Sequence, residues 1–305
     1  MQIARHGAIE LAYEMFGCAD GEPLLLISGT GVQMLMWPDA FVTTLAGRGF
    51  RVTRFDNRDA GLSTHLTEAE NPGWLKPLIR RAAAPYRLED MADDAVAVLD
   101  ALSWDSAHIV GASLGGMIAQ TMAIRHPSRV RTLTSIMSTP SARTGTMPKI
   151  STMRKLMQIA GTPANGPGEA AEATVALKRL LGTSRYPIDE ELIRDIGRRS
   201  YERDPGNEAD DFRQRAAVSA SGSRRKALAG VRIPTLVLHG GQDPIINVKG
   251  GRATAAAIPG ARLVVHPEMG HDLPRELWPS MLDEIAALAA RAPARPHSPQ
   301  PATPL

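Results

Sequence analysis

"HIVGASLGGMIAQ", His108 to Gln120, places a serine between two glycines, directly after an apolar run and directly before a helix-like one. Gly111, Ser113 and Gly115 match the pattern G-x-S-x-G. Small residues in this pattern let the chain turn sharply from a strand into a helix, which exposes the serine hydroxyl at the start of the helix. The turn also directs the backbone amide of Leu114 into the same space, where it could stabilise negative charge. The stretch therefore predicts a reactive serine, with a glycine-rich packing turn as the simpler alternative.

Strand-like and helix-like stretches alternate on both sides of this segment. The strand-like ones are short apolar runs bounded by turn residues, and the clearest helix-like one carries apolar residues at helical spacing. Short joints between them are typical of a mostly parallel sheet covered by helices. The expected strands are a pair of edge strands within Gln2–Gly17 and single strands at Pro23–Ser28, Arg51–Asp56, Ala107–Ala112, Val130–Ser138, Pro234–Gly240 and Ala261–Pro267. The expected helices are Asp39–Arg48, Leu88–Leu102, Leu114–His126, Arg252–Ile258 and Pro274–Ala290.

The alternation stops between about residues 140 and 230, where helical pieces follow one another without a buried strand. We interpret this region as a helical cap inserted into the core domain. After Arg291 the chain is rich in proline and has little to bury, which is typical of a disordered tail. The predicted division is 1–139 for the first part of the core, 140–230 for the cap or lid, 231–291 for the second part of the core and 292–305 for the tail.

A serine hydroxyl becomes a good nucleophile only when a neighbouring base takes its proton. Asp243, in "LHGGQDPI", and His271, in "HPEMGHDLP", each lie just past a predicted strand. Because parallel strands end at the same edge of a sheet, loops far apart in sequence can meet there. The order Ser113, Asp243, His271 is the one expected of the α/β-hydrolase fold. The simpler alternatives are a turn former before Pro244 for Asp243 and a surface histidine for His271.

The segments "GASLGG", "GQDPI" and "MGHDLP" resemble the α/β-hydrolase superfamily. The stretch containing "LLLISGTG", "WPDAF" and "RGFRVTRFDNRDAGLST" is similar to its aclacinomycin methylesterase-like and cofactor-free haloperoxidase-like serine esterases. The similarity extends from about Gly17 to Arg291 and is weakest in the insertion. It implies an α/β-hydrolase fold, with a mostly parallel eight-stranded sheet flanked by helices and a helical cap.

The same resemblance implies roles for individual residues. Ser113 would be the nucleophile, His271 the general base and later the acid, and Asp243 the carboxylate that orients the imidazole. The oxyanion donors would be the backbone amides of Thr30 and Leu114. We expect no metal and no cofactor in such a site.

Composition and charge exclude several other classes of protein. The chain has 305 residues, 43% of them hydrophobic, and a formal net charge of +3, which is typical of a globular domain. Lysine and arginine are scattered and accompany no nucleic-acid-reading motif, so we expect no nucleic-acid partner. Cys18 is the only cysteine, which excludes an internal disulfide and favours a reducing compartment. The sequence contains no recognisable secretion signal and no apolar run long enough for a membrane span, so we expect a cytoplasmic protein whose oligomeric state stays open.

Several residues outside the proposed triad are interpreted as loop-shaping or as candidate substrate-binding residues. Asp56 and Asp59 could form an acid–base pair, but we interpret them as hydrogen-bond partners that shape a loop near the nucleophile. Met34, Trp37 and Met147 are candidate substrate-binding residues that would line an apolar pocket, although core packing is the simpler alternative.

The sequence leads to an enzyme hypothesis with two alternatives. The first hypothesis is a serine carboxylesterase that hydrolyses a small-molecule ester through an acyl-enzyme. A perhydrolase or cofactor-free haloperoxidase activity would use the same residues, with peroxide in place of water. A ligand-binding receptor or pseudoenzyme with little turnover is the alternative from another class.

Overall fold

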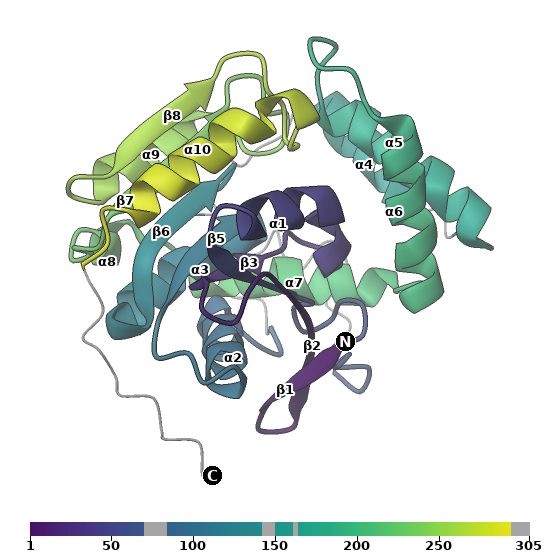
Figure 1. Cartoon of the computed structure of the whole chain (residues 1–305). Coiled ribbons are helices and arrows are strands. Elements are labelled where there is room, and N and C mark those ends of the chain that lie inside the picture. The colour runs from purple at the N-terminus through teal and green to yellow at the C-terminus, as the bar shows by residue number, and fades with distance from the viewer. Residues whose placement is uncertain (70–83, 142–149, 161–163, 294–305) are drawn as a thin grey trace.

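The apolar runs of the sequence form one eight-stranded sheet that lies between two layers of helices in the computed structural model of the protein (Figure 1). The structure describes residues 1–69, 84–141, 150–160 and 164–293. The strands are β1 (Gln2–His6), β2 (Ile9–Phe16), β3 (Glu22–Ile27), β4 (Phe50–Phe55), β5 (Ala107–Ala112), β6 (Val130–Ile136), β7 (Thr235–Gly240) and β8 (Arg262–His266). The helices are α1 (Asp39–Ala46), α2 (Leu88–Ala101), α3 (Leu114–Arg125), α4 (Ile150–Ala160), α5 (Pro167–Leu181), α6 (Glu190–Arg203), α7 (Glu208–Ser221), α8 (Arg225–Leu228), α9 (Lys249–Ala257) and α10 (Trp278–Ala289).

The strand order is β1-β2-β4-β3-β5-β6-β7-β8. The first two pairings are antiparallel and all the others are parallel, so the predicted mostly parallel sheet is confirmed. The chain moves outward from β3 to β4 and then returns to form β5 on the other side of β3. At such a point the loops leave two neighbouring strands in opposite directions. This opens a crevice at the carboxyl ends of the strands, which is where open α/β sheets bind ligands.

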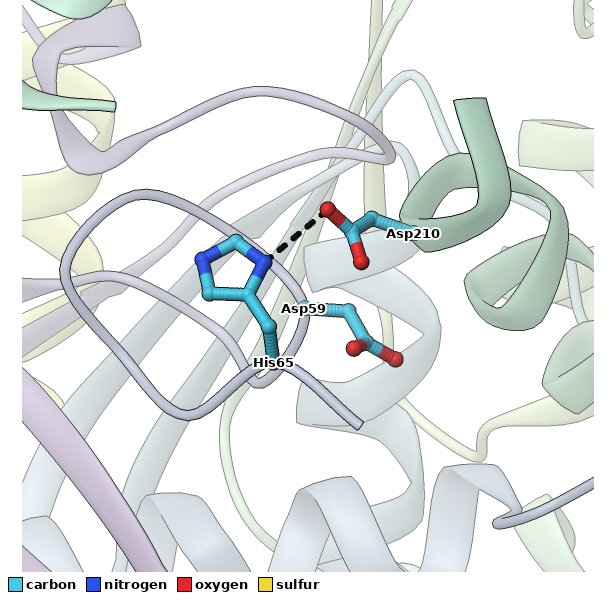
Figure 2. Close-up of side chains that lie close together, drawn as sticks. All are labelled: Asp59, His65 and Asp210. Atoms are coloured by element: carbon cyan, nitrogen blue, oxygen red, sulfur yellow. Dashed lines mark hydrogen bonds and ion pairs between the residues drawn. The ribbon is translucent and has the colours of Figure 1, made fainter. Parts of the chain in front are cut away.

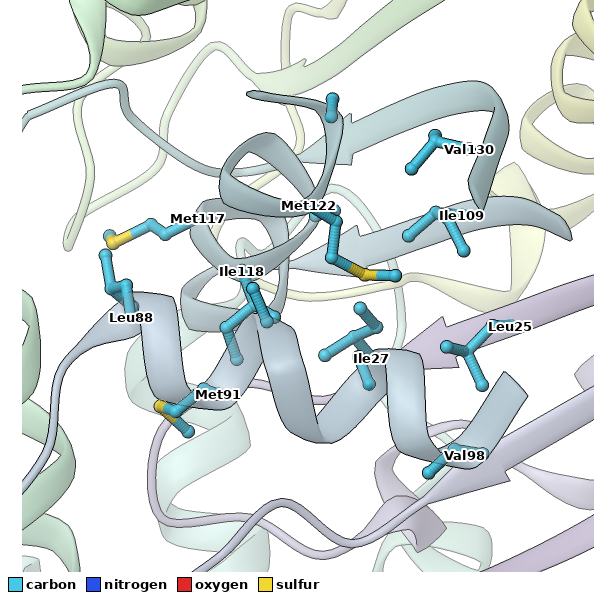
Figure 3. Close-up of a cluster of buried hydrophobic side chains, with 14 of the residues drawn as sticks. Leu25, Ile27, Leu88, Met91, Val98, Ile109, Met117, Ile118, Met122 and Val130 are labelled. Atoms are coloured by element: carbon cyan, nitrogen blue, oxygen red, sulfur yellow. The ribbon is translucent and has the colours of Figure 1, made fainter. Parts of the chain in front are cut away.

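Strand β3 shows how a continuous apolar run serves both faces of the sheet. Leu25 and Ile27 belong to a core cluster with side chains of α2 and α3, which Figure 3 shows around Met91, Ile118 and Met122. Leu24 and Leu26 belong to a second cluster, on the side of α1 and α10. Because successive side chains of a strand point to opposite faces, a strand covered on both faces must be apolar at every position.

Helix α3 is buried on nearly every side, with all residues from Leu114 to Ala123 buried. It packs against β3, β5, β6 and α2. This explains why its sequence is apolar all round instead of amphipathic. The packing fixes the start of α3, and therefore Ser113, relative to the carboxyl ends of the central strands.

Helices α4 to α8 lie between β6 and β7 in the chain, within the predicted cap region. Figure 1 shows α4, α5 and α6 as a group beside the sheet. Helix α5 packs against α6, whereas α7 reaches back to the core and packs against α2. The domain boundaries at residues 140 and 230 stay a prediction, and residues 294–305 of the predicted tail lie outside the described residues.

Among the described residues, each helix is too short or too polar to cross a membrane.

Candidate active site

Ser113 lies at the turn between β5 and α3 with φ +55° and ψ −116°. Two glycines make this turn sterically possible. A Cβ on Gly111 would lie 2.1 Å from the carbonyl oxygen of Gly115, and a Cβ on Gly115 would lie 2.1 Å from the carbonyl oxygen of Ile27. Both distances are far inside van der Waals contact, so the two glycines of the sequence motif allow α3 to start directly against the sheet.

Three side chains that are distant in sequence converge at this turn. Nε2 of His271 lies 3.1 Å from Oγ of Ser113, and Nδ1 of the same ring lies 2.7 Å from Oδ2 of Asp243. Asp243 follows β7 and His271 follows β8, as the sequence predicts. Ser113 is partly exposed, whereas the Asp243 side chain is fully buried. A base is therefore within hydrogen-bond reach of the hydroxyl of a partly exposed serine and is itself oriented by a carboxylate.

Asp243 is held in an ionised form by its surroundings. Its Oδ1 accepts hydrogen bonds from the backbone amides of Ile245 and Ile246, both at 2.8 Å. Burial by itself would raise the pKa of Asp243, but His271 and His239 outweigh it and hold the pKa below the usual carboxyl value. His239 is completely buried, and its Nε2 lies 3.5 Å from Oδ2 of Asp243. No sequence motif singles out His239, and its spacing of four residues from Asp243 is the one signal that could have pointed to it.

The loop after β3 passes beside the nucleophile. A Cβ on Gly29 would lie 3.5 Å from Cβ of Ser113. The amide of Gly29 donates to Sδ of Met36, and the amide of Gly31 donates to Oε1 of Gln214. The amides of Thr30 and Leu114, the two predicted oxyanion donors, have no acceptor within the part of the chain that the structure describes.

Asp56 and Asp59 are hydrogen-bond partners within the loops, as predicted. Asp56 accepts from the amides of Met34 and Leu62, and Asp59 accepts from the amide of Leu66. The structure adds a cap arginine to each, which the sequence did not reveal. Arg203 donates to Asp56 at 2.8 Å, and Arg213 donates to both oxygens of Asp59 at 2.8 and 2.9 Å.

The cap also contacts the loop that carries His271. The amide of His271 donates to the carbonyl oxygen of Leu181, the last residue of α5, at 2.8 Å. The neighbouring Asp272 does not serve as the partner of the imidazole, because its carboxylate faces Lys178 of α5 at 3.5 Å. Burial lowers the pKa of Lys178, although the carboxylate of Asp272 opposes this effect. Helix α5 therefore contacts the loop that carries His271 through the carbonyl oxygen of Leu181 and the side chain of Lys178.

The candidate substrate-binding residues are less informative. The side chains of Met34 and Trp37 are both completely buried. Trp37 packs against Phe41 in the core cluster on the α1 side, with ring centroids 5.5 Å apart. Met147 lies outside the described residues. The substrate-binding role of these residues stays a prediction, and the packing favours the simpler alternative for Trp37.

Asp59, His65 and Asp210 form a second group of titratable side chains, on the side of the loop that faces α7 (Figure 2). Their ligand atoms lie close enough together for a metal ion, but Arg213 already donates to both carboxylates. Nδ1 of His65 lies 2.9 Å from Asp210 and Nε2 lies 2.9 Å from the carbonyl oxygen of Gly61. The hydrogen bond with Asp210 raises the pKa of His65 to about 9. A histidine that donates from both nitrogens cannot bind a metal, so we interpret the group as an ion-pair network.

Comparisons with known proteins agree with the fold. A family model described as the alpha/beta hydrolase fold matches residues 22–274. Rhodomycin D methylesterase DauP of Streptomyces sp. strain C5 is 31% identical over 92% of this chain and 94% of its own length. Rhodomycin D methylesterase DnrP of Streptomyces peucetius is 30% identical over the same shares. The crystal structure of the enol-lactonase from Burkholderia xenovorans LB400 superposes with a TM-score of 0.70 at 24% identity, covering 95% of this chain and 100% of that one.

Proposed function

The chain belongs to the alpha/beta hydrolase fold family, and from this premise we propose that it is a carboxylic-ester hydrolase that uses Ser113, His271 and Asp243. The observation that carries the proposal is the continuous set of contacts from Ser113 Oγ through the His271 ring to Asp243, at 3.1 and 2.7 Å. The similarity to two rhodomycin D methylesterases over nearly the whole chain supports an ester as the substrate.

The first half of the proposed reaction forms an acyl-enzyme. His271 Nε2 takes the proton of Ser113 while Oγ attacks the carbonyl carbon of the ester. The carbonyl oxygen becomes an oxyanion, which would bind to the amides of Thr30 and Leu114, since neither amide has an acceptor among the described residues. The protonated imidazole then gives its proton to the departing alcohol, and the acyl group stays on Oγ.

The second half releases the acid. His271 takes a proton from water, the resulting hydroxide attacks the acyl carbon, and Ser113 recovers its proton when the carbon–oxygen bond breaks. Asp243 stabilises the imidazolium in both halves and keeps Nδ1 protonated. Its lowered pKa, opposed by burial but dominated by the two histidines, keeps it ionised throughout the neutral range.

Ser113→Ala tests the proposal directly. The nucleophile and the base act as one unit, so we expect the turnover number for p-nitrophenyl acetate to fall by about 10⁴–10⁶-fold. A matched Ser138→Ala variant, which removes a hydroxyl that donates to the carbonyl oxygen of Ser113, should keep most of the activity. An unchanged rate in Ser113→Ala would refute the assignment.

Two further experiments on the wild-type protein distinguish the esterase from the two alternative functions. A fluorophosphonate probe should label Ser113 covalently in the esterase, whereas a binding protein with an unactivated serine would remain unlabelled. Turnover of the same ester with peroxide and with water as the acceptor then distinguishes a perhydrolase from a hydrolase. A panel of methyl esters against larger alcohol esters would define the alcohol group, for which the two methylesterase relatives favour methyl.

A further inference from the structure

We propose that Gln214, on the cap helix α7, is a positioning residue that holds the oxyanion loop, defined here as residues 28–36, against the nucleophile. This inference rests on the proposed esterase function, and it assigns part of that function to the cap. The carrying observation is the hydrogen bond of 2.9 Å that the amide of Gly31 donates to Oε1 of Gln214.

Gln214 is completely buried, and both the oxygen and the nitrogen of its side-chain amide are hydrogen-bonded. Besides accepting from Gly31, it donates from Nε2 to the carbonyl oxygens of Arg58 and Asp59 at 2.9 and 3.3 Å. Carbonyl oxygens accept and never donate, so the amide has one orientation that satisfies all three contacts. Gln214 therefore joins the loop after β3 to the loop after β4, and neither a carboxylate nor an apolar side chain could do the same.

The contact lies next to the amide that matters for catalysis. The peptide groups on both sides of the Gly29–Thr30 peptide are restrained, one by Met36 through Gly29 and the other by Gln214 through Gly31. The peptide between them carries the Thr30 amide, which has no partner in the described residues. Gly31 has a φ of +65° and forms a turn together with Thr30. Fixing Gly31 thus fixes the direction in which the Thr30 amide points.

Helix α7 is a firm support for this contact. Arg213, the residue before Gln214, is buried and pairs with Asp59. Ala216 and Ala217 on the same helix are completely buried. A small displacement of an oxyanion donor is costly because the hydrogen bond must meet the charge that develops in the transition state. Loss of the Gln214 contact should therefore act on the transition state more than on the bound substrate.

Gln214→Leu tests the positioning role. We expect kcat for a p-nitrophenyl ester to fall about 10–100-fold while KM changes less than about threefold. Binding of a boronic acid, which forms a tetrahedral adduct with Ser113, should weaken by a factor similar to the loss in kcat/KM. The matched control is Gln120→Leu, which removes another completely buried glutamine, bonded to Ser135 and Arg224. This control should lower the melting temperature without the selective loss of kcat.

Gln214→Glu gives a readout that a purely structural role would not produce. An ionised glutamate cannot donate to the two carbonyl oxygens, whereas a protonated one can donate from its hydroxyl and accept from Gly31. The ratio of variant to wild-type kcat should therefore rise as the pH falls from 8 to 5, because burial favours the protonated form. If Gln214→Leu fails to fold, this ratio decides alone, and a flat ratio overturns the proposal.

The outcomes also separate this inference from the proposed function. Activity in Ser113→Ala would overturn the esterase assignment itself. Loss of activity in Ser113→Ala together with full kcat in Gln214→Leu would leave the esterase intact and overturn only the role of Gln214.

Discussion

Ser113 adopts a backbone conformation that few residues other than glycine adopt, with φ +55° and ψ −116°. Such a conformation persists only where the surroundings determine it, and here the surroundings are Gly111 and Gly115. The partly exposed Ser113, the Leu114 amide without an acceptor among the described residues and the strained turn are thus consequences of one local geometry. Stability and reactivity at this position depend on the same contacts.

Gly115→Ala tests this dependence. The new Cβ would meet the carbonyl oxygen of Ile27 at 2.1 Å, and backbone cannot move aside as a side chain can. We expect the free energy of unfolding to fall by about 1–3 kcal/mol, measured by urea denaturation, with a loss of esterase activity. The control is Gly168→Ala in α5, where a Cβ would meet nothing within 4 Å. Equal stability of the two variants would contradict the explanation.

Asp243→Asn should inactivate the enzyme without unfolding it. Oδ1 of Asp243 already accepts from the amides of Ile245 and Ile246, so the asparagine NH2 would occupy the other position and face Nδ1 of His271. The ring would then carry its proton on Nε2 and could not accept one from Ser113. We expect kcat to fall by about 10⁴-fold.

Asp272→Asn is the matched control for this prediction, because Asp272 is next to the base but faces Lys178. Its effect on kcat, measured with the same ester, should be far smaller. Similar losses in the two variants would show that Asp243 is not the specific partner of His271.

At the scale of elements, the sequence was sufficient to predict where a residue lies in the fold when that residue directly follows the end of a strand. Ser113, Asp243 and His271 each follow a short apolar run, and the parallel sheet brings the three loops to one edge. The contacts of the cap were not predictable in this way. Gln214 and Gly31 are separated by 183 residues, and neither residue carries a local signature of the other.

The histidine of the 56–66 loop shows the same limitation. No partner for His65 was visible in the sequence, because Asp204 and Asp210 lie in the cap, whose packing the sequence does not specify. Asp56 and Asp59 were correctly interpreted as loop-shaping residues, since their hydrogen bonds are made partly within their own loop. Hydrogen bonds within a loop could therefore be predicted from the sequence, whereas ion pairs between distant segments could not.

His65→Gln tests the link between this loop and the cap through its pH dependence. The hydrogen bond with Asp210 raises the pKa of His65 from 6.5 to about 9, and burial, the carbonyl oxygen of Gly61 and Asp204 modify it. A raised pKa means that the stabilisation is complete below about pH 6.5 and is lost as the pH rises through about 9. We expect wild type to be more stable than the variant by about 1–2 kcal/mol at pH 6.5, allowing for solvent screening.

The melting temperatures of the two proteins should converge as the pH rises from about 6.5 to about 9. The carboxylate of Asp59 also lies close to the ring, but it is the same in the two proteins. A constant difference in melting temperature across this range would contradict the assignment of His65 as the titrating group.

At the scale of the whole molecule, arginines from the predicted cap region form ion pairs with three aspartates of the predicted core. Each of the pairs joins a cap arginine to a core aspartate: Arg199–Asp39 at 3.2 Å, Arg203–Asp56 at 2.8 Å and Arg213–Asp59 at 2.8 Å. Two of these aspartates are completely buried, and they also hold the loops around the nucleophile. The cap and the oxyanion loop should therefore order together, and a cap that folded separately would leave buried carboxylates without a counter-charge.

Arg213→Met tests this coupling, since both side chains of the Arg213–Asp59 pair are nearly inaccessible to solvent. Removing one partner leaves a buried charge uncompensated, which typically costs about 3–5 kcal/mol. The control is Arg215→Met on the same helix, because Arg215 is exposed and its ion pair with Asp211, four residues away, should contribute less than about 1 kcal/mol. Scanning calorimetry should show one cooperative transition in wild type that moves to lower temperature in Arg213→Met. Two separate transitions in wild type, or equal shifts in both variants, would show that the cap and the core are independent units.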